Sequence, residues 1–167
     1  MNSVKQFVLT GLFVLGITIT GRAQIGEINY DNRIKTKLDA LGIKYSITEQ
    51  GAFKVIFEMG KNRTQLVVIK SNTHEYGGME IREISSVAAG CQIRSEFSQE
   101  NLFYLLEKNE TYKLGAWQIH GGSAPFLLEY SLRISANAAQ SVLDDLIRLA
   151  AKVADDMEQA LTDEDKY

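Results

Sequence analysis

A long apolar stripe near the end of the chain constrains the fold more than any other feature. Its members recur at spacings of three or four, which is the period of one face of an α-helix. They are Ala139, Val142, Leu143, Leu146, Leu149, Val153, Met157 and Leu161. Such a helix gains most of its stability from burying its stripe, so the rest of the chain must supply a matching apolar surface.

Strands before this helix are predicted to supply that surface. Alternating apolar residues and turn signals predict six strands, at residues 43–47, 53–57, 64–69, 79–88, 114–120 and 126–134. Short turns between neighbours make the pairs antiparallel. Residues 66–69 are apolar on both faces of their strand, which is typical of a central strand. Residues 72–78 are predicted to form a loop.

Two shorter helices complete the pattern. Asp31 and Ser98 are good N-cap residues, and Gly42 and Asn109 are placed to end these helices. We therefore predict an α+β fold with an antiparallel sheet of about six strands, in the order α-β-β-β-β-α-β-β-α. Three amphipathic helices need an apolar sheet face to cover, so one face should carry the helices. The other face is left for solvent, a ligand or a second subunit.

The first 23 residues have the pattern of a signal peptide. Lys5 supplies a positive charge, residues 7–19 form an apolar run, and Gly21 and Ala23 are the small residues that a signal peptidase reads. An uncleaved N-terminal anchor is the alternative, but the run is shorter than the roughly 20 residues of a membrane span. We therefore expect residues 24–167 to be exported, to the periplasm or out of the cell, with no stable membrane insertion after cleavage.

The composition of residues 24–167 excludes some classes of partner. The full chain has a formal charge of −3, and residues 1–23 contain two positive residues, Lys5 and Arg22. The remaining residues therefore have a formal charge of −5. No basic stretch dominates this surface, which argues against nucleic acid as a partner. Cys91, the single cysteine, is expected to be a buried structural thiol, with an intermolecular disulfide as the alternative. The aspartates of the last helix are expected on its solvent-exposed face: Asp144, Asp145, Asp155 and Asp156.

No pattern of residues names a reaction or a cofactor, so we predict that the protein is not an enzyme. His74 and His120 are the only histidines, and Glu75 follows the first. A metal site built from these three residues would require two predicted loops to meet in space. Metal binding is therefore kept as an alternative.

Four aromatic residues are the candidates for binding a partner. Trp117, Tyr104, Tyr112 and Tyr130 could line a binding groove. The alternative is that they belong to the core, as aromatic residues on strands commonly do.

The second half of the chain resembles the YbjN and type III secretion chaperone-like family. The resemblance rests on Leu-Leu-Glu-Lys-Asn at 105–109, Leu-Gly-Ala-Trp at 114–117, the apolar strand at 126–128 and the long helix that follows Ser135. It extends by element order over residues 28–161. It implies a single chaperone-like α+β domain over residues 24–167. Members of this family are small, often dimeric proteins that hold other proteins or act as regulators, without shared catalytic residues.

These observations predict an exported, non-catalytic module of the bacterial cell envelope that binds another protein, in a chaperone-like or regulatory role. A homodimer is expected. The alternatives are a binder of a small molecule or lipid, in a cavity between sheet and helices, and the metal-binding protein described above.

Overall fold

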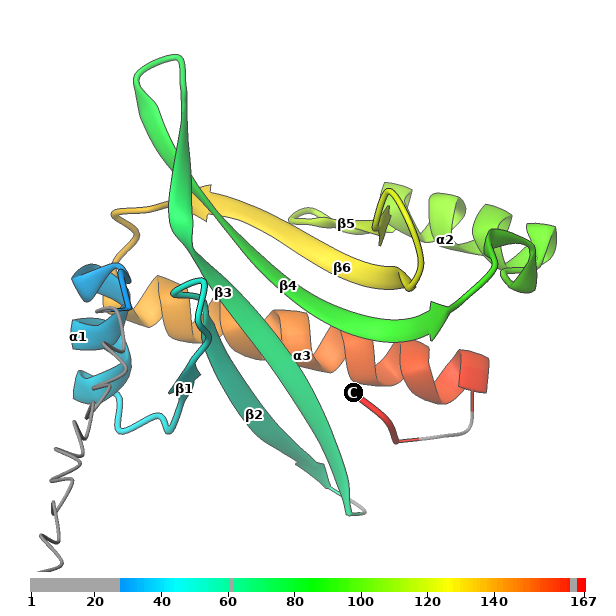
Figure 1. Cartoon of the computed structure of the whole chain (residues 1–167), viewed down its shortest axis with the longest axis horizontal. Helices are drawn as coiled ribbons and strands as arrows, with labels where there is room; N and C mark the ends of the chain where they lie inside the picture. The colour runs from blue at the N-terminus through cyan, green and yellow to red at the C-terminus, as the bar shows by residue number, and fades with distance from the viewer. Residues whose placement is uncertain (1–27, 61, 163–164) are drawn as a thin grey trace, which may run out of the picture.

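The computed structural model describes residues 28–60, 62–162 and 165–167 (Figure 1). The predicted signal peptide, residues 1–23, lies outside the described residues. The elements in chain order are α1 (Asn32–Ala40), β1 (Ser46–Ile47), β2 (Phe53–Gly60), β3 (Arg63–Tyr76), β4 (Met79–Cys91), a 3₁₀ turn η1 (Arg94–Glu96), α2 (Gln99–Thr111), β5 (Ala116–His120), β6 (Phe126–Ser135) and α3 (Gln140–Thr162).

The strands form one six-stranded antiparallel sheet in the order β1-β2-β3-β4-β6-β5. This confirms the predicted α+β class and element order, and the interior place of β3. Figure 1 shows α3 running behind the sheet, across the strands from β2 to β6. Asp31 and Ser98 cap α1 and α2 as predicted, since each side chain accepts a backbone N–H of the first turn.

The core lies between α3 and the sheet. Leu143, Ile147 and Ala150 of α3 are buried against core residues of the strands, such as Ile84 and Leu132. Ala150, Ala151 and Ala154 of α3 are almost completely buried, and their short side chains let the helix lie close to the sheet. Three members of the predicted stripe, Ala139, Val142 and Leu149, are exposed, so the buried face is shifted towards the three buried alanines.

The prediction of a loop at residues 72–78 is wrong. Residues 72–76 continue β3, and Tyr76 pairs with Met79 across a turn made of Gly77 and Gly78. Both glycines have positive φ, which suits the tight two-residue turns of β-hairpins. The β3–β4 hairpin therefore extends beyond the other strands (Figure 1).

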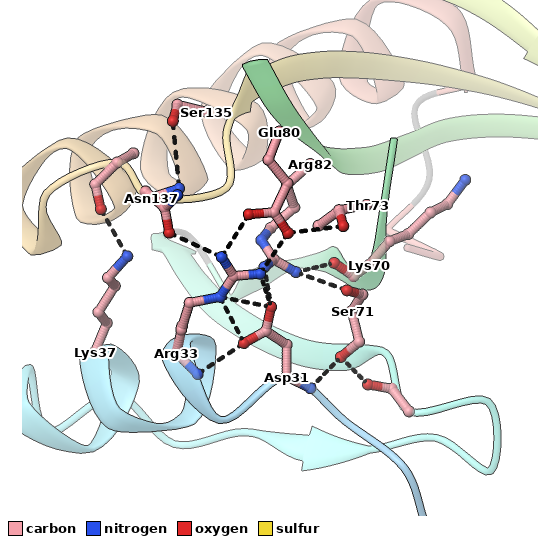
Figure 2. Close-up of polar contacts among 12 residues, drawn as sticks. Asp31, Arg33, Lys37, Lys70, Ser71, Thr73, Glu80, Arg82, Ser135 and Asn137 are labelled. Atoms are coloured by element: carbon pink, nitrogen blue, oxygen red, sulfur yellow. Dashed lines mark hydrogen bonds and ion pairs between the residues drawn. The ribbon is translucent and has the colours of Figure 1, made fainter. Parts of the chain in front are cut away.

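A polar network ties the base of this hairpin to α1 (Figure 2). The buried guanidinium of Arg82 donates to the carbonyl oxygens of Lys70, at 2.6 Å, and Ser71, at 3.1 Å, and it also pairs with the Asp31 carboxylate. Arg33 pairs with the same carboxylate and with Glu80 of β4. Charges that leave water need such partners.

The same network reaches the turn before α3. Arg33 Nη1 donates to Asn137 Oδ1 at 2.8 Å, and Lys37 Nζ donates to the carbonyl oxygen of Ala138 at 2.7 Å. The start of α1, the hairpin and the turn from β6 to α3 are thereby held together, although they lie far apart in the sequence.

Candidate partner-binding site

An apolar groove opens between α2 and the edge of the sheet. Its volume is about 250 Å³, and we call it the α2–β5 groove. It is lined chiefly by Leu102, Leu105 and Leu106 of α2, Trp117 and Ile119 of β5, and Leu128 of β6. These residues are near neighbours because β5 pairs with β6 at the edge of the sheet and α2 lies over that edge.

The groove is open because α2 buries little of its apolar surface. Leu105 is 3% exposed and joins the core, whereas the neighbouring Leu106 is 64% exposed. Phe103 and Tyr104 are also exposed, and Ile119 is exposed on the facing strand. Contiguous exposed apolar residues of this kind mark sites of interaction.

Trp117 lines the groove, and its indole N–H is a buried hydrogen-bond donor without a partner among the described residues. The side chain is 6% exposed. Leaving a buried donor unpaired costs about 1–3 kcal/mol. The groove also includes the polar side chains of Asn109 and Gln118.

The structure separates the four aromatic candidates. Trp117 and Tyr112 pack against the ring of Tyr130, with ring centroids 5.5 and 5.0 Å away. Tyr130 is fully buried and donates its hydroxyl to the carbonyl oxygen of Leu114, and burial raises the pKa of this phenol to about 12. Tyr104 stands apart on the exposed side of α2. Trp117 is therefore the member of the four that lines the groove.

The metal-site alternative is wrong, because His74 and His120 lie at opposite ends of the sheet. His74 is on β3 and pairs with Ile81, which lies beside Ser135 at the end of β6. His120 pairs with Leu127, eight residues earlier on β6. At about 3.3 Å per residue this separates the two histidines by roughly 25 Å along the strands. Over the described residues, no group of three or more His, Cys, Asp or Glu residues could hold a metal ion.

Sequence reasoning missed a buried acidic cluster on α3. Asp155 was expected on the exposed face, but it is buried and pairs with Arg63 Nε at 2.7 Å. Glu158 is fully buried and lies 3.2 Å from Arg63 Nη2. Glu158 follows Ala154 by four residues and precedes Leu161 by three. These spacings place Glu158 on the buried side of the helix, and they are the sequence signal that could have predicted its burial.

Cys91 is a free, buried thiol at the end of β4. Burial raises the pKa of this thiol, and the nearby Glu96 acts in the same direction. Both effects disfavour the reactive thiolate. None of the helices in the described part of the chain is both long enough and apolar enough to cross a membrane.

Comparison with known proteins gives a match at the level of the fold. No family model matches the chain, and no curated protein is significantly similar to it. The crystal structure of YbjN from E. coli, described as a candidate transcription regulator, superposes with a TM-score of 0.51. The match covers 81% of this chain and 92% of YbjN, at 9% sequence identity.

The chain has a YbjN-like fold. The match confirms the YbjN part of the resemblance that the residues at 105–128 led us to expect. It extends over 81% of the chain. A likeness to YbjN at so low an identity concerns the architecture, and function must be argued from the sites of this chain.

Proposed function

We propose that the protein is an exported, non-catalytic module of the cell envelope that binds another polypeptide in the α2–β5 groove. The observation that carries this proposal is the apolar α2–β5 groove itself, which Trp117 lines and in which Leu106 and Ile119 remain exposed. The YbjN-like fold is consistent with a regulatory or binding role. Chaperone-like and regulatory modules both act by such non-catalytic binding.

The chemistry of the groove favours a polypeptide as its occupant. A peptide offers apolar side chains together with polar backbone groups, and the groove likewise combines apolar residues with the polar Asn109 and Gln118. A volume of about 250 Å³ suits one or two side chains and falls below the usual 300–1,000 Å³ of small-molecule pockets. Binding of a small molecule or lipid therefore stays the second candidate.

The test uses the full chain and two matched variants. Leu106→Asp places a charge in the groove, whereas Val142→Asp places one on an exposed apolar position of α3. After cross-linking in the native envelope, the proposal expects a partner protein that Leu106→Asp loses, with at least a tenfold lower yield, and Val142→Asp retains. Equal yields with the two variants, or no partner at all, would contradict it.

The purified partner gives a direct reading of the groove. Trp117 is the single tryptophan of the chain, so its fluorescence reports this site without labelling. Binding in the groove should shift its emission, and binding elsewhere should leave the emission unchanged. Light scattering on the same sample tests the expected homodimer, which would show twice the monomer mass. A retained small ligand in native mass spectrometry would favour the second candidate.

A further inference from the structure

The sheet is split between β3 and β4 at one end. The register of these strands ends at the pair Val67–Ser86. Beyond this pair β4 continues to pair with β6 but no longer with β3: Ala89 lies opposite Leu128, and Cys91 lies opposite Phe126. We call the opening between residues 63–66 of β3 and residues 87–91 of β4 the β3–β4 seam.

Residues 165–167 lie against β3 in this seam and accept two of its backbone N–H groups, one through a backbone oxygen and one through a side chain. The backbone N–H of Leu66 donates to the carbonyl oxygen of Tyr167 at 2.7 Å, and that of Thr64 donates to Asp165 Oδ1 at 3.2 Å. The two donors are two positions apart along the strand, so they lie on the same edge of β3. Figure 1 shows the last residues of the chain in the opening between β3 and β4.

Glu158 holds the same segment from the side of α3. Its Oε1 accepts the backbone N–H of Lys166 at 2.8 Å and that of Tyr167 at 3.1 Å. The carboxylate is fully buried, and its other oxygen faces Arg63. A buried carboxylate that accepts backbone N–H groups is a strong receptor for an extended peptide, because charge-assisted bonds are stronger than neutral ones.

Gly90 of β4 makes room for the aromatic ring. A Cβ atom at position 90 would lie 2.6 Å from the hydroxyl oxygen of Tyr167 and 3.0 Å from Leu127 Cδ2. The phenol therefore lies directly against the backbone of β4, and a side chain at position 90 would force it to move. The seam thus has an edge strand, a charged anchor and a place for one aromatic side chain.

We propose that the β3–β4 seam is a binding site for an extended peptide of another polypeptide, and that residues 165–167 occupy it as a competing internal ligand. The contacts define the partner: an extended segment with an aromatic residue two positions after an acidic one. They involve backbone groups and one aromatic side chain, so they do not depend on the covalent link to α3. The site is separate from the α2–β5 groove and does not rest on the function proposed for it.

The experiment measures binding of a labelled peptide with the sequence of residues 162–167 to the full chain. Tyr167→Ala weakens the internal ligand and should bind the peptide at least tenfold more tightly than the unmodified chain. Adding Gly90→Ala should abolish this gain, because the new Cβ takes the place of the phenol. Gly122→Ala is the matched control, since a Cβ there meets no atom within 4 Å. A peptide with alanine in place of the tyrosine should not bind.

Hydrogen exchange of the Leu66 amide tests the internal ligand without any peptide. Gly90→Ala should accelerate this exchange at least tenfold and leave the amides between β4 and β6 unchanged, whereas Gly122→Ala should change neither. The proposal is overturned if Gly90→Ala leaves Leu66 protected, or if the folded Tyr167→Ala chain binds no peptide at millimolar concentration. Leu106→Asp should leave peptide binding intact, which separates this site from the groove.

Discussion

A guanidinium group that is 2% exposed needs acceptors for its donors, and Arg82 finds them on segments distant in sequence. It binds the Asp31 carboxylate and the carbonyl oxygens of Lys70 and Ser71. We expect Arg82→Met to lower the free energy of unfolding by about 3 kcal/mol, because it leaves a carboxylate and two carbonyl groups without their donor. Urea unfolding measures this loss.

Arg133→Met is the matched control for that substitution. Arg133 lies on the exposed face of the sheet, 3.9 Å from Glu83. Exposed ion pairs contribute little, so the expected loss is about 0.5 kcal/mol or less. Similar losses for the two variants would contradict the structural role of Arg82.

The carboxylates around Arg33 make stability depend on pH. Hydrogen bonds from Arg33 and Thr73 lower the pKa of Glu80 from 4.5 to about 2. Burial opposes ionisation of Asp31, but hydrogen bonds from Arg33 and Arg82 outweigh it and lower its pKa as well. Because both pKa values are lower in the folded state, their contribution is complete above about pH 4.5 and is lost as the pH falls towards 2.

Urea unfolding at a series of pH values between 6 and 2 tests this dependence. The free energy of unfolding should fall over the acidic part of the range. Glu80→Gln should flatten the fall, because position 80 then has no proton to bind. Glu100→Gln, on α2 and away from the network, should keep the original slope. An unchanged slope in Glu80→Gln would show that the network does not act through Glu80.

Among the elements, α2 and α3 differ in how they are held. The long helix lies across the sheet, whereas α2 is attached to the β5 edge and anchored in the core by Leu105. We expect Leu105→Ala to lower the free energy of unfolding by about 2–4 kcal/mol, since it removes a buried leucine. Leu106→Ala should change it by less than about 0.5 kcal/mol, because the side chain is exposed.

These two variants separate structure from binding on one helix. Thermal unfolding should distinguish them, and the cross-linking yield should fall for Leu106→Ala although its stability is unchanged. If both variants were equally destabilised, α2 would be packed more deeply than its exposed side chains indicate. Amide hydrogen exchange should also be faster in α2 than in the buried part of α3, because few buried contacts oppose local opening.

For the whole molecule, the predicted signal peptide would determine which residues remain in the mature protein. The signal-peptide pattern predicts that full-length protein made in bacteria is processed to residues 24–167, and intact mass spectrometry of the exported fraction measures this. Ala23→Arg should block cleavage, because it removes the small residue that the peptidase reads. Ile25→Ala, just beyond the predicted cleavage site, should be processed normally. Unprocessed protein in the unmodified chain would favour the uncleaved anchor.

The local pattern of the sequence determined the order of the elements, the α+β class and the N-caps Asp31 and Ser98. Apolar periodicity and capping depend on neighbouring residues, so they can be read without knowledge of distant contacts. The YbjN-like architecture was expected from a family resemblance at residues 105–128 and the last helix, and the structural match confirms it at 9% identity.

Only the tertiary structure decided which sites exist. Strand pairing placed His74 and His120 at opposite ends of β6, and it extended the hairpin through residues 72–76. The position of α2 at the sheet edge left Leu106 exposed beside the unpaired indole of Trp117. The split between β3 and β4 brought Glu158 to residues 165–167. Each of these features depends on how whole elements pack together in three dimensions. The local periodicity of the sequence does not predict such packing.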